Sequence, residues 1–502
     1  MKKRFIAAIM IFLLLAALLA SCNSGGNTDT SSAVSSENSD TSETVSTPKW
    51  EYDPEIPETF DGEGKDFTFL VVGGDNEAYH SVDIGSWGEV TPDVISEAVQ
   101  ERNDFIEEEL NIKIVVEYQL GGNITTYIRN MVDSNDDTYD VVMPFINDAS
   151  ALAMDGYLIP LADGETLNLE GVWWDQNANE QLTVGNVLYF TTGDISMLDN
   201  DCTQSIMFNT DLVSELNIDD PYELLKSGDW TIDNMISMAK TATVMNNEFA
   251  PTSYKNRWGL HINVNGATGM YIGTGERLTS KDNEDYPQIA LGTSRAATAF
   301  SKIYELMHDS SYCIIIENYN DEAKGDGFVN CYRAAAEQIA KKNALFRVMS
   351  MSDTDRLLEY DCNYGILPMP KLDSNQDKYY SLVSTLAVPG VCIPTTNSDL
   401  ERTGYILDAM AAKAKELVTY AYYDVKMKNR IANDQNARDS LDIIFDSTVY
   451  DLGVVYDWGS IRSFINNAAT ASSNTYTSQL DAAKTSIQAA IDQTVEDFKK
   501  DS

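Results

Sequence analysis

The sequence predicts an α/β protein with two lobes, each a doubly wound sheet flanked by helices. Strand and helix patterns alternate from residue 66 onward, and strand–helix–strand order favours parallel pairing through right-handed crossovers. The part of the chain from about residue 50 to residue 502 is also too long for one compact hydrophobic core. These two observations predict the α/β class of the fold and its division into two lobes.

Each early element has a local signal. The first strand is rich in β-branched and aromatic residues and stops at Gly73-Gly74, and Thr91-Pro92 opens a helix whose apolar residues recur at helical spacing as far as Leu110. Further strands and helices then follow in alternation. The predicted strands are 66–72, 112–116 and 139–143, and the predicted helices are 94–110, 124–132 and 149–156.

The first 22 residues have the pattern of an exported protein. Lys2, Lys3 and Arg4 precede an apolar run from Phe5 to Ala20, which is shorter than the ~20 residues that a spanning helix needs. The ending Leu19-Ala20-Ser21-Cys22 resembles the bacterial lipobox, which implies a signal peptide over 1–21 and a lipid on Cys22. We therefore expect a lipid-anchored protein on the extracellular face of the bacterial cytoplasmic membrane. An ordinary signal peptide or an uncleaved anchor is the alternative.

The segment 22–59 and the overall charge restrict the function further. Most of this segment is Ser, Thr, Asn, Gly, Asp and Glu, a composition typical of a flexible tether. The whole chain has a formal charge of −43, and no basic stripe replaces phosphate counterions, so we expect no nucleic-acid partner.

No catalytic or metal-binding motif is present. The three histidines are far apart, and the five cysteines after residue 22 have no C-x-x-C spacing, so we expect neither a metal nor a cofactor. The sequence leaves open whether two of these five cysteines form a single disulfide. The many carboxylates leave a glycosidase pair open too, because such a pair is defined by its separation in space.

Several segments together resemble extracellular solute-binding protein family 1, the lipid-anchored receptors of bacterial ABC importers. The segments are Tyr139–Pro144, Asn147–Ala149, Gly156–Leu161, Asn343–Ser350, Tyr364–Lys371, and Leu386–Gly390 with the helix 400–423 after it. The resemblance implies a two-lobed periplasmic-binding-protein-like fold with several hinge crossings. It implies a first lobe of 60–165 plus 386–455 and a second lobe of 166–385 plus 456–502. The helical spacing of apolar residues over 480–498 predicts an amphipathic helix that closes the second lobe.

The resemblance also implies a ligand cleft between the lobes. Aromatic rings pack on the C–H faces of sugars, and Asp, Asn and Arg side chains bind the hydroxyls. We therefore predict a monomeric receptor that passes a small polar solute, an oligosaccharide, to an ABC permease. The predicted ligand-binding residues are Asn147, Asp148, Trp173, Trp174, Asp353, Arg356, Tyr456 and Trp458. A surface glycan hydrolase, or a sensing or adhesion lipoprotein with the same fold, is the alternative.

Overall fold

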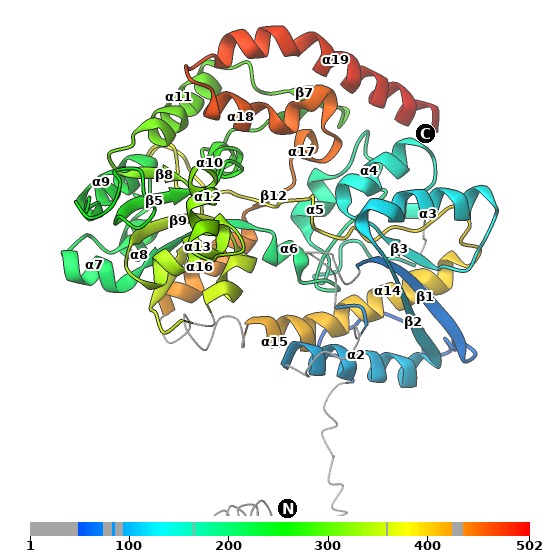
Figure 1. Cartoon of the computed structure of the whole chain (residues 1–502). Helices are drawn as coiled ribbons and strands as arrows, with labels where there is room; N and C mark the ends of the chain where they lie inside the picture. The colour runs from blue at the N-terminus through cyan, green and yellow to red at the C-terminus, as the bar shows by residue number, and fades with distance from the viewer. Residues whose placement is uncertain are drawn as a thin grey trace, which may run out of the picture. The chain divides into compact units, whose positions relative to one another are not determined.

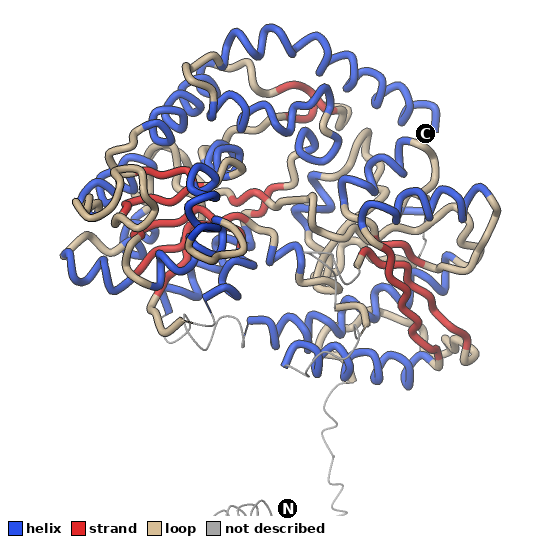
Figure 2. Tube along the Cα trace, viewed as in Figure 1, coloured by secondary structure: helices blue, strands red, loops and turns tan. Residues whose placement is uncertain are grey.

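The computed structural model describes residues 49–73, 83–85, 94–163, 166–357, 360–423 and 435–501. The chain divides into the unit 1–49 and a compact unit from Trp50 to Ser502. The predicted signal peptide, Cys22 and nearly all of the predicted tether lie outside the described residues. Within the larger unit, strands form two separate groups, each surrounded by helices (Figures 1 and 2).

The first lobe is built on a parallel sheet with strand order β2-β1-β3. All eight residues of β1 pair with β2, from Lys65 with Ile112 to Val72 with Gln119, and β3 pairs with the other side of β1. This arrangement confirms the predicted parallel pairing, because helices α2 and α3 supply the crossovers. The bounds are Lys65–Val72 for β1, Val94–Leu110 for α2, Ile112–Gln119 for β2, Gly121–Asp133 for α3, Val141–Met143 for β3 and Ile146–Met154 for α4.

A long helical segment also belongs to the first lobe. Helix α14 (Leu400–Ala414) packs against α2, and it continues through the π-helical turn η4 (Lys415–Thr419) into α15 (Tyr420–Tyr422). The sequence predicts one helix over 400–423, and the structure agrees apart from the π turn. Such turns are frequent at functional sites.

The second lobe is built on a five-stranded mixed sheet with strand order β10-β4-β9-β5-β8. Strands β9, β5 and β8 are parallel, whereas β4 runs antiparallel to both β9 and β10. The strands are β4 Gln204–Asn209, β5 Trp258–Ile262, β8 Cys313–Ile315, β9 Ala344–Ser350 and β10 Tyr364–Leu367. The helices are α7 Thr210–Leu216, α8 Pro221–Ser227, α9 Ile232–Ala242, α10 Gly266–Gly273, α11 Ser294–His308, η2 Ile316–Tyr319, α12 Asn320–Gly325, α13 Cys331–Ala340, η3 Met351–Leu357 and α16 Gln435–Asp446.

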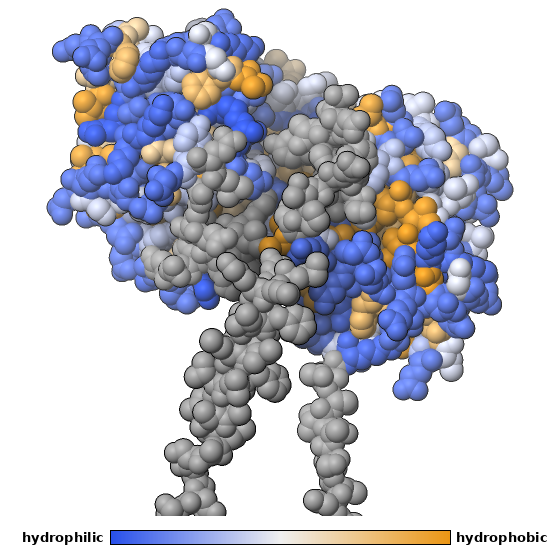
Figure 3. Space-filling view, turned by 60° about the horizontal axis from the view of Figure 1, so that its bottom comes forward, coloured by the Kyte–Doolittle hydropathy of each residue, from blue (hydrophilic) through white to orange (hydrophobic). Residues whose placement is uncertain are grey.

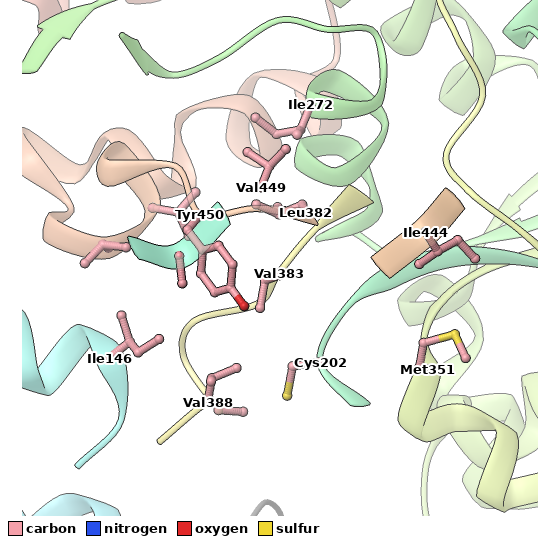
Figure 4. Close-up of a cluster of buried hydrophobic side chains, with 14 of the residues drawn as sticks. Ile146, Cys202, Ile272, Met351, Leu382, Val383, Val388, Ile444, Val449 and Tyr450 are labelled. Atoms are coloured by element: carbon pink, nitrogen blue, oxygen red, sulfur yellow. The ribbon is translucent and has the colours of Figure 1, made fainter. Parts of the chain in front are cut away.

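Three chain segments meet side by side between the two sheets. Strand β11 (Ser381–Leu382) pairs with β12 (Thr448–Val449), and Thr203 forms a bridge with Val383. Buried side chains of these segments form one cluster with Ile146 and Val388 on the side of the first lobe and with Met351 and Ile444 on the other side (Figure 4). These segments are the crossings. The short elements η1 Leu161–Asp163, α5 Gln176–Gln181 and α6 Leu198–Asp201 precede the first crossing.

The C-terminal elements cover the top of the molecule in Figure 1. Asp451 accepts hydrogen bonds from Leu278 N and Thr279 Oγ1, which ties this segment to the hairpin β6–β7 of the second lobe. Helix α19 packs on η6, β7, α18 and α11, and it also contacts α4. The bounds are β6 Thr279–Lys281, β7 Pro287–Ile289, α17 Leu452–Tyr456, η6 Trp458–Ser460, α18 Ile461–Thr470 and α19 Tyr476–Asp501.

Two segments lie in a different lobe from the one that the resemblance implies. In the segment after residue 166, Trp174 pairs with Gly193 and Trp173 binds Asp408 of α14, so the chain leaves the first lobe only near residue 200. Helix α16 packs against β10 and α8 of the second lobe, because its apolar face includes Leu441 and Ile444. Crossing points are set by tertiary contacts of this kind, which strand spacing alone does not fix.

The described surface is mainly hydrophilic. On the face turned forward in Figure 3, hydrophobic residues form only small separate patches on the two lobes. No helix among the described residues combines the length and the apolar character that crossing a bilayer requires. Where the structure describes them, the five cysteines after residue 22 are all free thiols, and four of them are buried.

Candidate functional site

The carboxyl ends of the parallel strands in both sheets point toward the crossings. Strand β9 ends at Ser350, which pairs with Gln204 at the start of β4, where the chain enters from the first crossing. In the first lobe, the chain that returns from the second crossing pairs Pro389 with Phe145, just beyond the end of β3. Ligands of open α/β sheets bind outside the carboxyl ends of strands. The strand register therefore places the candidate site where the two edges meet the crossings.

Carboxylates of the first crossing bind the helical segment α14–η4–α15. Asp194 accepts hydrogen bonds from Lys415 Nζ at 3.0 Å and from Thr419 Oγ1 at 2.6 Å, both in the π turn. Asp201 accepts a hydrogen bond of 2.8 Å from the Tyr422 hydroxyl. The π turn therefore faces the crossing with its polar side chains. We call Asp83, Asp194, Asp199, Asp201, Tyr422 and Tyr423 the tyrosine–aspartate cluster.

Residues of the second lobe lie opposite this cluster. Burial and the neighbouring Asp201 raise the pKa of Tyr422 well above the usual value, and the charge of Asp355, an exposed residue of η3, adds a smaller contribution. The rings of Tyr423 and Phe445 in α16 meet edge to face, with their centroids 5.7 Å apart. The cluster thus lies at the junction of both lobes.

Burial determines the electrostatics of the cluster. The pKa of Asp199 is raised well above its ordinary value by desolvation and by the charges of Asp175, Asp194 and Asp83. The pKa of Asp83 is raised by desolvation, although Met197 N donates to its carboxylate at 2.7 Å. Burial therefore favours the uncharged form of both carboxyl groups.

The carboxyl edge of the second sheet carries an Arg–Asp–Arg group. Arg347 of β9 and Arg356 of η3 both donate to the carboxylate of Asp353, and the Arg356 guanidinium lies over the Tyr332 ring at 5.9 Å. Tyr332 donates a hydrogen bond of 3.2 Å to Glu317. The predicted ligand residues Asp353 and Arg356 are therefore brought together here, with Asp353 buried and Arg356 partly exposed.

Trp173 and Trp174 lie away from this edge. Both indole nitrogens donate to the same oxygen of Asp408 in α14, each at 2.8 Å, and both side chains are buried. Asn168 N donates to the other oxygen of Asp408 at 2.6 Å. The polar edges of both rings are thereby satisfied inside the first lobe. Contact between either ring and a ligand stays a prediction.

The other four predicted residues gather around α4 and the C-terminal elements. Asn147 donates to the carbonyls of Val454 and Val455, at 2.8 and 2.5 Å. The rings of Tyr456 and Trp458 stack at 4.9 Å with only 4° between their planes.

Asp148 is half-buried in the same region. Desolvation raises its pKa, and the charges of Arg129 and Arg462 oppose that shift. The eight predicted residues thus fall into three separate groups, and only Asp353 and Arg356 reach the carboxyl edge of the second sheet.

The tyrosine–aspartate cluster is absent from the sequence prediction. Its signals in the sequence are the carboxylates at 194, 199 and 201 in the segment Gly193–Asp201 and the tyrosines at 420, 422 and 423. Neither set has a diagnostic spacing, and the two are far apart in the chain. Among the described residues, no group of three or more His, Cys, Asp or Glu side chains is arranged to hold a metal ion.

Comparison with known proteins finds similarity only at the level of structure. No family model matches the sequence, and no curated protein matches it. The sugar-binding protein MalE of Xanthomonas citri superposes with a TM-score of 0.54 at 11% identity, over 87% of this chain and 98% of that one.

Two further solved structures are similar. A solute-binding protein of an ABC transporter from Thermotoga lettingae, bound to α-D-tagatose, gives a TM-score of 0.52 at 14% identity, over 85% of this chain and 100% of that one. The maltose-binding protein MalE of Listeria monocytogenes, in complex with maltose, gives a TM-score of 0.51 at 14% identity, over 86% of this chain and 98% of that one. At these identities the similarity concerns the fold, which is the two-lobed periplasmic-binding-protein-like fold.

Proposed function

We propose that this protein is an extracytoplasmic receptor that captures a small polar solute, an oligosaccharide, between its lobes and delivers it to an ABC import permease. The observation that carries the proposal is the meeting of the two carboxyl edges at the crossings, beside the tyrosine–aspartate cluster. The fold neighbours solved with maltose and with tagatose support a sugar as the class of solute.

The chemistry of the cluster suits a neutral, hydroxyl-rich ligand. Carboxylates accept hydrogen bonds from hydroxyls, tyrosine hydroxyls donate or accept them, and aromatic rings cover the C–H faces of a sugar. The partly exposed carboxylates of Asp194 and Asp201 supply the polar groups, and Tyr423 with Phe445 supplies aromatic surface. This mixture of groups favours a carbohydrate over a purely apolar ligand.

Capture would depend on a hinge equilibrium. The lobes are joined by three short crossings around Thr203, Val383 and Val449. A solute that touches elements of both lobes binds the closed arrangement better than the open one, and it shifts the population by that difference in affinity. This step forms no covalent bond, so the proposal needs no catalytic group.

A screen of solutes tests the proposal. Thermal shift and tryptophan fluorescence of the full chain would be recorded with mono- and oligosaccharides, peptides and metal ions. A ligand that binds only the folded state adds about 2.7 kcal/mol of stability at a hundredfold excess over its Kd. A saturable shift with one sugar, and no product, is expected. Hydrolysis of a glycan would favour the hydrolase, and no response to any sugar would contradict the proposal.

We also propose that a lipid on Cys22 anchors the protein to the membrane, as the lipobox-like ending suggests. Cys22→Ser removes the thiol to which the lipid would be attached, whereas Ser24→Ala changes a neighbouring residue as a control. The first variant is expected in the soluble fraction of cells and the second in the membrane fraction. Equal membrane association of both variants would contradict lipid anchoring through Cys22.

A further inference from the structure

A cavity of about 790 Å³ opens on the second lobe, at the edge of the sheet away from the crossings. Its lining includes Asn343, whose carbonyl accepts a hydrogen bond of 2.9 Å from the backbone nitrogen of Trp258. Trp258 is the first residue of β5 and Asn343 immediately precedes β9, so the cavity lies at the amino ends of these parallel strands. The candidate solute site lies at their carboxyl ends. The cavity is therefore a separate feature, and its volume is within the range of small-molecule sites, about 300–1,000 Å³.

One side of the cavity is a loop whose two ends are bonded to each other. Val244 and Arg257 form an antiparallel bridge, with hydrogen bonds of 2.8 and 3.1 Å between their backbones. Inside the loop, the buried side chain of Asn256 accepts from Asn246 N and donates to the carbonyl of Ala250, each at 2.8 Å. Compact loops with close ends are frequently functional. These bonds fix the loop, so the side chains that it presents to the cavity are held in place.

Apolar side chains line the cavity from this loop and from the turn after α12. Val244 and Phe249 are 47% and 37% exposed. Phe328, which is partly exposed, meets the ring of Tyr254 edge to face, with the centroids 6.4 Å apart. Single exposed apolar residues are common on protein surfaces, whereas a group of them around one concave site is typical of a ligand-binding site. The cavity therefore suits a ligand with an apolar body.

Most charged groups of the lining are already paired. Three lysines line the cavity, and each binds a carboxylate: Lys255 binds Asp326, Lys341 binds Glu337, and Lys342 binds Asp211 and Glu215. Both carboxylates of the lining, Asp326 and Glu337, are used in these pairs. Neither the lysines nor these carboxylates are left without a partner of opposite charge.

Arg257 is the exception among the cations of the lining. Its Nε donates to the carbonyl of Ala242 at 2.8 Å, and no carboxylate of the described residues forms an ion pair with the guanidinium. The side chain is partly buried. A guanidinium is always charged, and its two Nη groups can donate side by side to the two oxygens of one carboxylate. Arg257 is thus available to a ligand that carries one negative charge.

We infer that this cavity binds a small organic acid with one carboxylate on an apolar body. The carboxylate would accept from the two Nη groups of Arg257, and the body would pack against Val244, Phe249 and Phe328. One available cation suits one negative charge, and the carboxylates of the lining would repel a polyanion. A neutral sugar would leave Arg257 without an acidic partner. This site is independent of the solute receptor proposed above, because it lies within one lobe and at the opposite edge of its sheet.

Three acids and their uncharged amides test the inference. Phenylacetate, indole-3-acetate and octanoate, each beside its amide, would be titrated against the full chain by saturation-transfer NMR. At least one acid should bind saturably. Its amide should bind at least about tenfold more weakly, because it lacks the charge-assisted hydrogen bonds to the guanidinium. No saturable binding by any acid, or equal affinity of acid and amide, would overturn the inference.

Variants of the lining separate the two parts of the ligand. Arg257→Gln should lower the affinity for the acid to that for the amide. Phe249→Ala, at an exposed position, should weaken acid and amide by a similar factor, because it removes only apolar contact. Arg129→Gln, at a partly exposed arginine of the first lobe, is the control and should keep the affinity of the unaltered protein. Equal affinity of Arg257→Gln and Arg129→Gln for the acid would overturn the assignment.

A crystal of the unaltered protein soaked in the tightest-binding acid gives a test that needs no variant. Density for the carboxylate beside Arg257, with the apolar body between Val244 and Phe328, would support the site. Density for the acid only at another position, such as between the lobes, would overturn it.

Discussion

The indole nitrogen of Trp458 donates a hydrogen bond of 2.8 Å to Thr494 Oγ1 in the C-terminal helix α19. The ring is also stacked on Tyr456 and is 4% exposed. The Tyr456 ring also meets Phe498 of α19 edge to face, with the ring centroids 6.3 Å apart. Trp458 thus anchors the helix that closes the chain.

This anchoring predicts a large effect on stability. Replacement of a buried tryptophan by alanine costs about 3–5 kcal/mol through lost burial and the cavity left behind. We expect Trp458→Ala to lower the free energy of unfolding by about that amount. Thr494→Val leaves the buried indole N–H of Trp458 without its acceptor and should cost about 1–3 kcal/mol. Urea unfolding measures both. A cost for Trp458→Ala no larger than that for Thr494→Val would contradict the packing role.

Contact between Trp458 and the solute is a separate prediction. Trp458→Phe keeps much of the packing but shortens the ring, and Thr494→Val removes the same hydrogen bond from the other partner. If the ring touches the solute, calorimetric titration with the sugar found in the screen should give weaker binding for Trp458→Phe only. Equal affinities in the two variants would remove Trp458 from the site.

Asp408 should be a main stabilising residue of the first lobe. Asp408→Asn leaves one oxygen for the two indoles, but it sets an amide N–H₂ against the donor Asn168 N. We expect a loss of about 1–3 kcal/mol, the cost of one unsatisfied buried donor, and a larger loss for Asp408→Ala. Glu401→Gln, at an exposed position of the same helix, is the control and should have little effect. An unchanged free energy of unfolding in Asp408→Asn would contradict this role, because it would show that the amide finds other hydrogen-bond partners.

The stability of the protein should depend on pH through Asp199. Its pKa in the folded state is raised well above the ordinary value, mainly by desolvation. The folded state therefore holds a proton that the unfolded state releases above about pH 4, so the stability falls as the pH rises from there through the folded pKa.

The matching variant is Asp199→Asn, which cannot titrate. Urea unfolding between pH 4 and pH 8 should show a shallower fall in stability for this variant than for the unaltered protein. It should also be more stable near pH 8, because no buried charge forms. Parallel pH profiles would contradict the assignment to Asp199.

The first lobe could be predicted well because its signals are local. The apolar strand before Gly73-Gly74 and the periodic helix that ends at Leu110 both fold as their patterns indicate. The functional residues are harder to predict, because Asp201 and Tyr422 are far apart in the chain and meet only through the packing of η4 and α15 on the first crossing.

Aromatic residues are conspicuous in the sequence, but their role is difficult to predict from it. Trp173 and Trp174 have the composition expected of a sugar site, but the sequence does not reveal that Asp408 satisfies both indoles inside the lobe. The same residue type serves packing and ligand binding, so composition alone does not assign either role.

The affinity of Asp355→Ala for the solute tests the central claim most directly. Asp355 is exposed on the second lobe, opposite Tyr422 of the first lobe, so its loss should weaken binding without a change in the fold. Loss of a hydrogen bond to a charged group costs about 1.5–3 kcal/mol, which corresponds to an affinity at least about tenfold weaker. Glu223→Ala, at an exposed position of α8 in the same lobe, is the control. Calorimetric titration with the sugar found in the screen should show this loss for Asp355→Ala alone. Equal affinity of the two variants and the unaltered protein would contradict a solute site between the lobes at the tyrosine–aspartate cluster.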